Sequence, residues 1–446
     1  MIARLGAFLT RVATRAVPDP FVLALLLTLL TAAIGALVSD APDVGWTLAS
    51  GWFDGFSSAP LLAFALQMCL VLVTGHALAL SPPVQGLVVR LGRIPFSTAS
   101  AAAFVALVAC LSAIVHWGLG AIVGAFVARE IGREAKRQGR TIHYPLLGGA
   151  AYAGLAVWHG GLSGSAPLKV AEEGHFAAEI VGTLTIGDTL LSPLNLLVTG
   201  TLCVAIPLAF YLMAPRHEEE MQPADLPATE ETVETEAHPG IANWLQESPL
   251  VGRVVGLAAI ALVIGAWATG RRSLDLNLVN LFFLFLGLAG QGSVRRYVAA
   301  VADGARGAGA IIVQFPFYFG ILGLMKASGL ITGMSQAFAS VASATTFPLM
   351  AFASAGAVNL FVPSGGGQWA VQGEVLLQAG NDLGVDPAVT VMAFAYGDAW
   401  TNMLQPFWAL PLLGIMGLRA RDIIGYTGVV CILMGILVPA LLLLWA

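Results

Sequence analysis

The sequence predicts an all-α polytopic membrane protein. Of its 446 residues, 57% are hydrophobic and only 11% are charged, against about 25% charged residues in ordinary soluble domains. Apolar runs of about 20 residues, the length that crosses a bilayer as a helix, recur along the whole chain. No series of alternating ten-residue strands occurs, so the crossings must be helical. This composition excludes a soluble enzyme, a disordered chain and a coiled coil.

Seven apolar runs predict simple crossings. They are separated by short polar or glycine-containing segments, and each is long enough to span the hydrocarbon layer or nearly so. These runs are 20–39, 59–80, 190–213, 250–268, 277–291, 307–326 and 422–445.

Four further apolar stretches are irregular. Residues 98–131 are interrupted around His116 and residues 346–378 around Asn359, and we interpret both as re-entrant hairpins whose halves are too short to cross. Residues 145–170 and 389–416 hold polar and helix-breaking residues in their middles, and we interpret both as broken crossings. About nine crossings result.

The order of these elements repeats, which predicts two structural repeats. Residues 1–213 form the first repeat, with its hairpin and broken crossing, and residues 269–446 form the second. The linking span 250–268 makes the number of crossings between them odd, so the repeats should have opposite topology. The segment 214–249 holds nine acidic residues, five prolines and one arginine, a composition typical of a solvated cytoplasmic linker.

The distribution of basic residues predicts the orientation. With the N-terminus in the cytoplasm and both hairpins returning to the side they entered, only Lys169, Arg271, Arg272 and Lys326 face outward. The other 17 of the 21 lysines and arginines then face the cytoplasm, as the positive-inside rule requires.

The net charge and the positions of the cysteines limit the kinds of partner that the protein is expected to bind. The net charge is −5 with no basic stripe, so we expect no nucleic-acid partner. The four cysteines lie far apart in apolar runs, without a CxxC motif or a Cys/His cluster, so we expect neither a metal site nor disulfides. The expected partners are membrane lipid and a small substrate, with no cofactor.

The four interruptions predict the functional site. A break in a helix is costly in hydrocarbon, since its freed backbone groups find no water. Discontinuous helices of inverted repeats bind substrates at their half-helix ends, where N–H groups attract an anion and carbonyl groups attract a cation. The candidate substrate-binding residues are His116, Trp117, Gly118, Ser163, Gly164, Ser165, Asn359, Pro363, Ser364, Gly365, Gly366, Gly367, Gln368, Thr401, Asn402 and Gln405.

The composition of these breaks favours a monoanion as substrate. None of the interrupted motifs contains an arginine or lysine, which a dicarboxylate or phosphorylated substrate would be expected to need. Aromatic residues near the breaks are candidates for walls around a small apolar tail, although some will serve only in packing. They are Trp117, Trp158, Trp369, Trp400 and Phe407.

Asp398 is the candidate for coupling transport to an ion. It lies inside a break, and an ionisable residue at membrane depth is a functional hypothesis by default. It could take up a proton or hold Na⁺, and the sequence leaves both open. His116, at a hairpin tip, could bind substrate, titrate or serve only as a hydrogen-bonded structural residue.

Three motifs are distinctive when taken together. They are Val362–Trp369 (VPSGGGQW), Ala395–Asp398 (AYGD) and Gln405–Pro411 (QPFWALP). Through them the chain resembles the short-chain fatty acid transporter family, the acetoacetate/butyrate permease type of the ion transporter superfamily. The resemblance implies uptake of short-chain fatty acids or acetoacetate across a bacterial inner membrane. It also implies a scaffold, a mobile transport domain, elevator motion and a homodimer. His116 stands where the family pattern has asparagine.

Three other functions compete with this interpretation. The same scaffold could carry another organic anion, such as a dicarboxylate or a sugar acid, or the protein could be a passive channel. An intramembrane serine protease is a remote alternative, because Gly161–Gly164 matches a GxSG pattern. That short pattern is common in glycine-rich helices and leaves the second repeat without a purpose, so we expect no enzyme activity.

Overall fold

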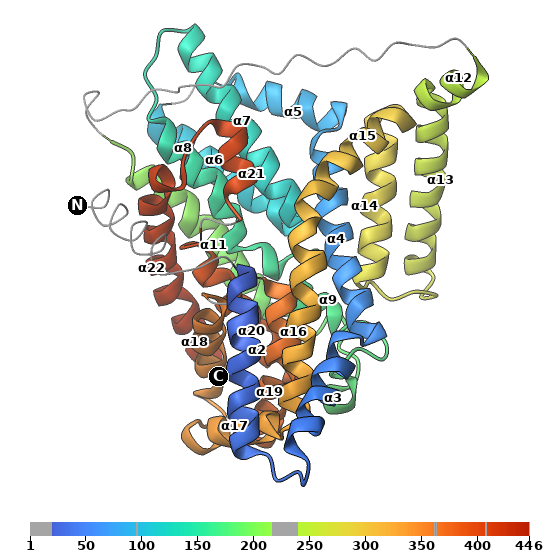
Figure 1. Cartoon of the computed structure of the whole chain (residues 1–446). Helices are drawn as coiled ribbons and strands as arrows, with labels where there is room; N and C mark the ends of the chain where they lie inside the picture. The colour runs from blue at the N-terminus through green and yellow to red at the C-terminus, as the bar shows by residue number, and fades with distance from the viewer. Residues whose placement is uncertain are drawn as a thin grey trace.

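The computed structural model describes residues 20–94, 97–215, 240–360, 362, 364–405 and 408–445. Within these ranges the regular structure is helical throughout and contains no strand. The long helices run side by side in the vertical direction of Figure 1, and short or tilted helices connect them. An all-helical chain with several long apolar helices agrees with the fold class predicted from the sequence.

The first half contains long apolar helices, a helix pair and an interrupted segment. The pair is α6 and α7, which are separated by a break at His116, and the interrupted segment runs from α8 to α9. The elements are α2 (Pro20–Val38), α3 (Val44–Phe56), α4 (Ala59–Ala79), α5 (Pro82–Gly92), α6 (Thr98–Val115), α7 (Trp117–Arg137), α8 (Tyr144–Tyr152), η1 (Ala153–Ala156), η2 (Trp158–Gly160), α9 (Ser165–Lys169), α10 (Ala178–Val181) and α11 (Pro193–Leu212).

The second half contains the same kinds of element. Its helix pair is α18 and α19, and its interrupted segment is α20 and α21. The elements are α12 (Ile241–Glu247), α13 (Pro249–Ala268), α14 (Leu276–Gln291), α15 (Val294–Ala305), η4 (Arg306–Ala308), α16 (Gly309–Ala327), α17 (Leu330–Val341), α18 (Phe347–Asn359), α19 (Gly365–Asp382), α20 (Pro387–Asn402), α21 (Leu410–Met416) and α22 (Ala420–Trp445).

Capping side chains explain where several helices begin. Ser97 and Ser100 form a reciprocal capping box at the start of α6, Ser192 accepts a hydrogen bond from the N–H of the third residue of α11, and Asp275 does the same for α14. Each cap satisfies one of the backbone donors that a helix leaves free at its first turn. The polar residues between apolar runs therefore set the ends of the helices.

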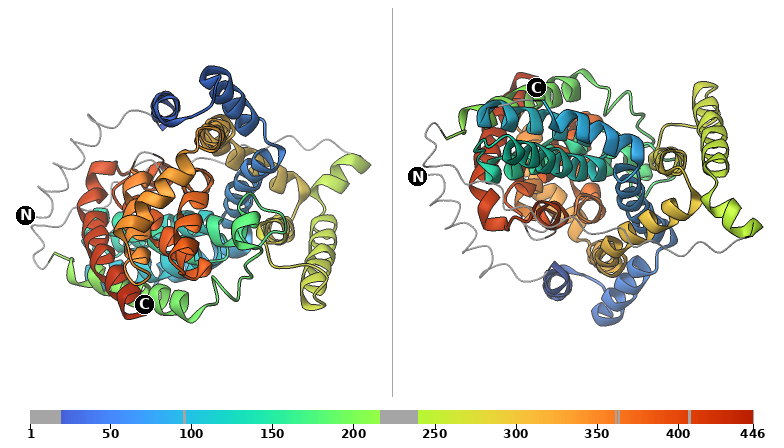
Figure 2. Two further views of the ribbon diagram at one scale, coloured as in Figure 1. Left: turned by 90° about the horizontal axis from the view of Figure 1, so that it is seen from below. Right: turned by 90° about the horizontal axis from the view of Figure 1, so that it is seen from above.

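The buried apolar side chains form two cores. One includes residues of both helix pairs, both interrupted segments, α11 and α22. The other includes residues of α2, α4, α14 and α16. Helices α9 and α19 contribute to both, so they lie where the two cores meet. Figure 2 shows α13 and α12, in yellow-green, at the edge of the molecule opposite α22.

Helices at matching positions in the two halves have matching neighbours. Helix α5 packs against α7 in the first half, and α17 packs against α19 in the second. Likewise α4 packs against α7, and α16 against α19. Helices also pack across the two halves in matching pairs. Helix α14 packs on α4, and its counterpart α2 packs on α16. Helix α15 packs on α4, and its counterpart α3 packs on α16. The neighbours of these helices thus match between the halves, and the two inverted repeats stay a prediction.

Five of the described helices are long and apolar enough to cross a membrane, and α15 with α16, bent by 42°, would make a sixth. One of the five is α6, of 18 residues, although the sequence analysis judged both halves of 98–131 too short to cross. That expectation was wrong for α6 by length, because the helix begins at Thr98 and runs unbroken to Val115. At 1.5 Å per residue its length approaches the roughly 30 Å of the hydrocarbon layer. The number of crossings stays a prediction.

Candidate functional site

The interruptions within each half are joined by hydrogen bonds. In the first half, the Trp117 N–H donates to Ser163 Oγ at 2.8 Å, and the Leu162 N–H donates to the Ile114 carbonyl at 2.7 Å. A Cβ atom on Gly161 would lie 2.3 Å from that same carbonyl oxygen, so only glycine permits the close approach. The first helix break therefore lies directly against the interrupted segment that follows it.

The second half is joined in the same way. Asn359, the last residue of α18, donates from Nδ2 to the Asp398 carbonyl at 2.7 Å, to Thr401 Oγ1 at 2.9 Å and to Asn402 Oδ1 at 2.9 Å. Gln405, in the break after α20, donates from Nε2 to the Asn359 carbonyl. The helix pair and the interrupted segment of the second half thus share one buried amide network.

Tyr152 and His159 connect the interrupted segments of the two halves. The hydroxyl proton of Tyr152 is shared between the carbonyls of Asn402 and Gln405, whose oxygens lie at 2.9 and 2.8 Å. His159 Nδ1 lies 3.0 Å from Asp398 Oδ2. With the contacts inside each half, these bonds bring the four breaks to one region.

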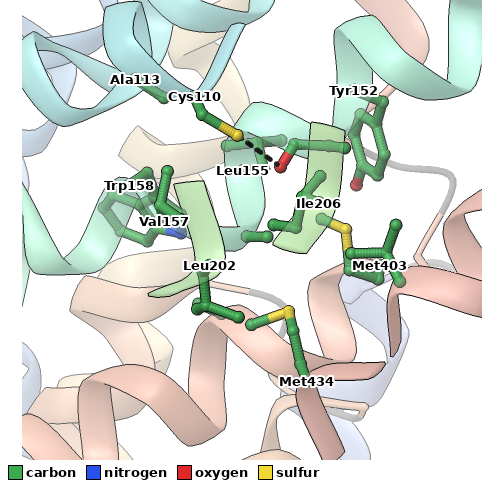
Figure 3. Close-up of a cluster of buried hydrophobic side chains, with 14 of the residues drawn as sticks. Cys110, Ala113, Tyr152, Leu155, Val157, Trp158, Leu202, Ile206, Met403 and Met434 are labelled. Carbon is green, nitrogen blue, oxygen red and sulfur yellow. Dashed lines mark hydrogen bonds between the residues drawn. The ribbon is translucent and has the colours of Figure 1, made fainter. Parts of the chain in front are cut away.

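A pocket with an empty volume of about 450 Å³ opens at this convergence. Helices α4 and α16 of the second core form one side, and the breaks of the first core form the other. Figure 3 shows Leu155 and Trp158 of the pocket wall within the buried cluster that also contains Tyr152 and Met403. The lining residues are Met68, Trp117, Leu155, Trp158, Ile311, Phe315, Ser364, Gly365, Gly366, Asn402 and Trp408.

Five of the predicted substrate-binding residues line this pocket: Trp117, Ser364, Gly365, Gly366 and Asn402. Pro363 and Phe407 lie outside the described residues. The remaining predicted residues are buried and do not line the pocket. They are His116, Gly118, Ser163, Gly164, Ser165, Asn359, Gly367, Gln368, Thr401 and Gln405.

The aromatic predictions divide in a similar way. Trp117 and Trp158 line the pocket, whereas Trp369 packs on Phe394 and Trp400 stacks on Phe352, both away from it. The sequence analysis missed several lining residues, and the clearest is Trp408, which lies inside the quoted QPFWALP motif. The others missed are Met68, Leu155, Ile311 and Phe315.

His116 lies on the far side of its helix break from the pocket. Its ring is fully buried and packs edge-on against Phe283 of α14, with centroids 4.6 Å apart. A Cβ atom on Gly75 of α4 would lie 2.3 Å from the His116 ring. Among the described residues neither ring nitrogen has a hydrogen-bond partner. This position places His116 between the two cores.

The three glycines Gly365–Gly367 are explained by their neighbours. They form the first turn of α19, and Ser364 caps this turn by accepting from the third N–H. A Cβ atom on the first, second and third glycine would lie 2.9 Å from Trp158, 3.0 Å from Met68 and 2.6 Å from Tyr318. A Cβ atom at each position would therefore meet a neighbour, and glycine lets this turn approach both cores.

Asp398 forms a buried chain of hydrogen bonds with His159 and Ser165. The side chains of His159 and Asp398 are fully buried, and His159 Nε2 lies 3.1 Å from Ser165 Oγ. The Ala166 N–H donates to the same Nε2 at 3.1 Å. A backbone N–H can only donate, so Nε2 is an acceptor and the proton of a neutral His159 is on Nδ1, which donates to Asp398 Oδ2.

Asp398 Oδ1 and three amide oxygens have no partners. The amide oxygens are Asn359 Oδ1, Gln368 Oε1 and Gln405 Oε1; all four atoms are buried, and none accepts a hydrogen bond from the described residues. Buried acceptors of this kind normally find a donor or a cation, because an unsatisfied polar atom is costly. Asp398 Oδ1 is therefore a candidate site for a proton or a cation.

A second buried ionic cluster links the two cores at α9. Lys169 Nζ lies 2.6 Å from Glu172 Oε2 and 5.1 Å from the ring centroid of Phe64 on α4. Gln67 of α4 donates from Nε2 to Glu172 Oε1 and to Asn277 Oδ1, both at 2.8 Å. The sequence predicts that Lys169 faces outward, and no sequence pattern indicates this cluster. Its charge is neutralised by Glu172, and no charged side chain lines the pocket itself.

The geometry also tests whether Ser163 or Ser165 could act as the nucleophile of a serine protease. Ser163, the serine of the GxSG pattern, accepts from the Trp117 backbone, and no hydrogen bond joins it to a histidine among the described residues. Ser165 does contact His159, but it is fully buried and His159 Nε2 also accepts from the Ala166 N–H. A nucleophile needs access to substrate and a free base, and neither serine combines the two.

Comparison with known proteins gives a consistent result. A family model described as short chain fatty acid transporter matches residues 1–445. The chain is 39% identical over 437 residues to a protein of Escherichia coli (strain K12), and 35% identical over 438 residues to one of Haemophilus influenzae. Both relatives are named "Putative short-chain fatty acid transporter", and each alignment covers 96% of both chains.

A solved structure shares the fold. The YdaH transporter of Alcanivorax borkumensis superimposes with a TM-score of 0.60, covering 95% of this chain and 98% of that one. Sequence identity is 16%, so the likeness concerns the fold alone. The family match, by contrast, indicates a role in transport across a membrane.

Proposed function

The chain belongs to the short-chain fatty acid transporter family, and we propose that it carries butyrate, acetoacetate and similar small monocarboxylates across the bacterial inner membrane by ion-coupled transport. The observation that carries this proposal is the pocket where the four breaks meet. Its polar side is Ser364, Asn402 and the first turn of α19, whose N–H groups suit one carboxylate.

The other side of the pocket supports a short apolar tail. Trp117, Trp158, Trp408 and Phe315 provide aromatic surface opposite the polar side, which suits an apolar tail. A second carboxylate, or the hydroxyl groups of a sugar acid, would be buried against this surface without a partner. Such burial costs several kcal/mol, so the pocket favours monocarboxylates.

Competition for uptake tests the substrate class. Purified protein in liposomes should take up labelled butyrate, and unlabelled acetoacetate should compete for it. Succinate and gluconate should need concentrations at least about tenfold higher for the same inhibition, because their extra polar groups are left unpaired. Equal inhibition by succinate or gluconate would instead support the organic-anion alternative. Net current without counterflow exchange would support a channel.

The transport cycle proposed here rests on two inverted repeats, about nine crossings, a cytoplasmic N-terminus and elevator motion of the first core against the second. The matched helix neighbours of the two halves support the repeats, and the separation into two cores that meet at the pocket supports the motion. The homodimer follows from the family resemblance alone. Cysteine accessibility at the ends of α6 and α19 tests whether the two hairpins re-enter.

We assign the coupled ion to Asp398 and favour a proton over Na⁺. His159 already donates to Oδ2, so Oδ1, which no described residue contacts, is the atom open to a proton. Asn402 lines the pocket and its Nδ2 lies 3.4 Å from Asp398 Oδ2, so a bound substrate anion would repel this carboxylate. Protonation of Asp398 neutralises the carboxylate and removes this repulsion, so proton uptake and substrate binding are coupled. A Na⁺ gradient that drives uptake without a pH gradient would contradict the proton.

Replacing His159 with phenylalanine tests its part in the coupling. Phenylalanine preserves the stacking on Trp158, where the centroids are 4.3 Å apart, but removes the hydrogen bond to Asp398. Without that donor the buried carboxylate loses a hydrogen bond to a charged group, worth about 1.5–3 kcal/mol. Gradient-driven uptake of labelled butyrate should therefore fall about tenfold or more, while exchange of labelled for unlabelled butyrate persists. Gradient-driven uptake equal to that of the parent would assign His159 a purely structural role.

A further inference from the structure

A second cavity, with an empty volume of about 750 Å³, lies away from the transport pocket. Its walls come from the start of α5, the start of α13 and the junction of α14 with α15. Arg253 of α13 and Arg296 of α15 both line it and are both exposed. Nothing in the proposed transport cycle uses this cavity.

The cavity carries net positive charge from the residues that line it. Glu247 is the acidic residue of its wall, and Arg295 neutralises it at 2.8 Å. Arg295 also donates to the side chains of Asn243 and Gln246 on α12, and these bonds fix the Arg295–Glu247 ion pair in place. In the described parts of the chain, neither Arg253 nor Arg296 has an ion-pair partner. Two guanidinium groups thus face one cavity without a counter-charge.

The surroundings of the cavity have the character of a membrane interface. Helix α12 exposes Ile241 (79%), Trp244 (61%) and Leu245 (46%) beside the cavity wall. A short helix with exposed tryptophan and aliphatic side chains is typical of the headgroup layer. Helix α13 continues from it, and its window of membrane-spanning length is only 17% buried. Figure 1 shows α12 at one end of α13, at the edge of the molecule.

We propose that this cavity binds the headgroup phosphate of an anionic phospholipid, with the acyl chains lying along the exposed apolar face of α13. Guanidinium groups bind phosphate through paired N–H donors, and basic pockets between membrane helices on the cytoplasmic side bind anionic headgroups. Free phosphate would contact only the two arginines and would leave the apolar face of α13 uncovered. The lipid also covers exposed side chains such as Val254 and Leu257, so it matches both parts of the surface.

Native mass spectrometry and thermal unfolding test the proposal. Delipidated protein is mixed with phosphatidylglycerol, with phosphatidylcholine or with inorganic phosphate. Phosphatidylglycerol should bind and raise the unfolding temperature, whereas the other two should have little effect. The double variant Arg253→Gln/Arg296→Gln should bind phosphatidylglycerol about 30-fold more weakly, the expected loss for two arginines at a membrane surface.

The control is Arg90→Gln/Arg93→Gln, which removes two exposed arginines at the other end of α5. It should bind phosphatidylglycerol as the parent does. Equal loss in this control would show a general effect of surface charge and overturn the proposal. Stabilisation by inorganic phosphate alone would overturn the lipid as ligand, and so would unchanged lipid binding in the Arg253/Arg296 variant. Because the readout is binding and unfolding, these outcomes do not depend on the substrate proposed above.

Discussion

Replacing Asp398 with asparagine is expected to abolish accumulation of butyrate driven by an ion gradient while leaving exchange of labelled for unlabelled butyrate measurable. The asparagine Oδ1 can still accept the proton of His159 Nδ1, which lies 3.0 Å from the carboxylate in the parent. The buried chain with Ser165 therefore survives, and so does the fold. The variant cannot change its charge, however, so substrate binding no longer depends on the coupled ion.

Uptake and counterflow in the same liposome preparation separate the two effects. Gradient-driven accumulation should fall more than about tenfold, since a coupling energy of even 1.4 kcal/mol corresponds to a factor of ten. Asp54→Asn is the control, because Asp54 is exposed on α3 and contacts only Ser50. Accumulation at the level of the parent in Asp398→Asn would show that the ion is coupled elsewhere. Loss of counterflow together with accumulation would show that Asp398 is needed for binding or folding instead.

The interruptions were predictable from sequence because their cause is local. Runs such as Gly365–Gly367, and the polar residues between Asp398 and Gln405, do not favour an apolar helix. The sequence therefore located the four breaks to within a few residues. The expectation that Asp398 lies inside a break was wrong, because α20 continues through Asp398 and ends at Asn402. The long helices were also predictable, since about 20 apolar residues in a row admit few other structures.

The pocket wall was less predictable, because a broken helix loses the regular period that tells which side chains share a face. Asn402 lines the pocket, whereas Thr401, one residue earlier, donates to the Gly356 carbonyl behind it. Residues such as Met68 and Ile311 lie in ordinary apolar helices. Nothing in one sequence distinguishes them from lipid-facing neighbours.

His159 illustrates the same limit for chemistry. The sequence shows an ionisable residue at membrane depth, but its partner Asp398 is 239 positions away. Only the folded chain brings the two interrupted segments together and fixes which ring nitrogen carries the proton. The role assigned to His159 thus depends on long-range contacts that local patterns do not contain.

The second large effect is expected for Gly367→Ala, which should reduce uptake more than about tenfold. Alanine favours a helix over glycine by up to about 1 kcal/mol, so the local effect on α19 is favourable. The added Cβ would lie 2.6 Å from the ring of Tyr318, which is fully buried on α16. Overpacking of this kind costs about 1–3 kcal/mol. The clash arises between the two cores, so it should disturb their approach and the pocket between them.

Uptake of labelled butyrate, normalised to the amount of folded protein in the liposomes, measures this effect. Gly200→Ala is the matched control, since a Cβ atom at Gly200 on α11 meets nothing within 4 Å. It should transport as the parent does. The double variant Gly367→Ala/Tyr318→Leu should recover part of the uptake, because the smaller side chain makes room for the methyl group. Normal transport by Gly367→Ala alone would mean that α19 does not approach α16 this closely during the transport cycle.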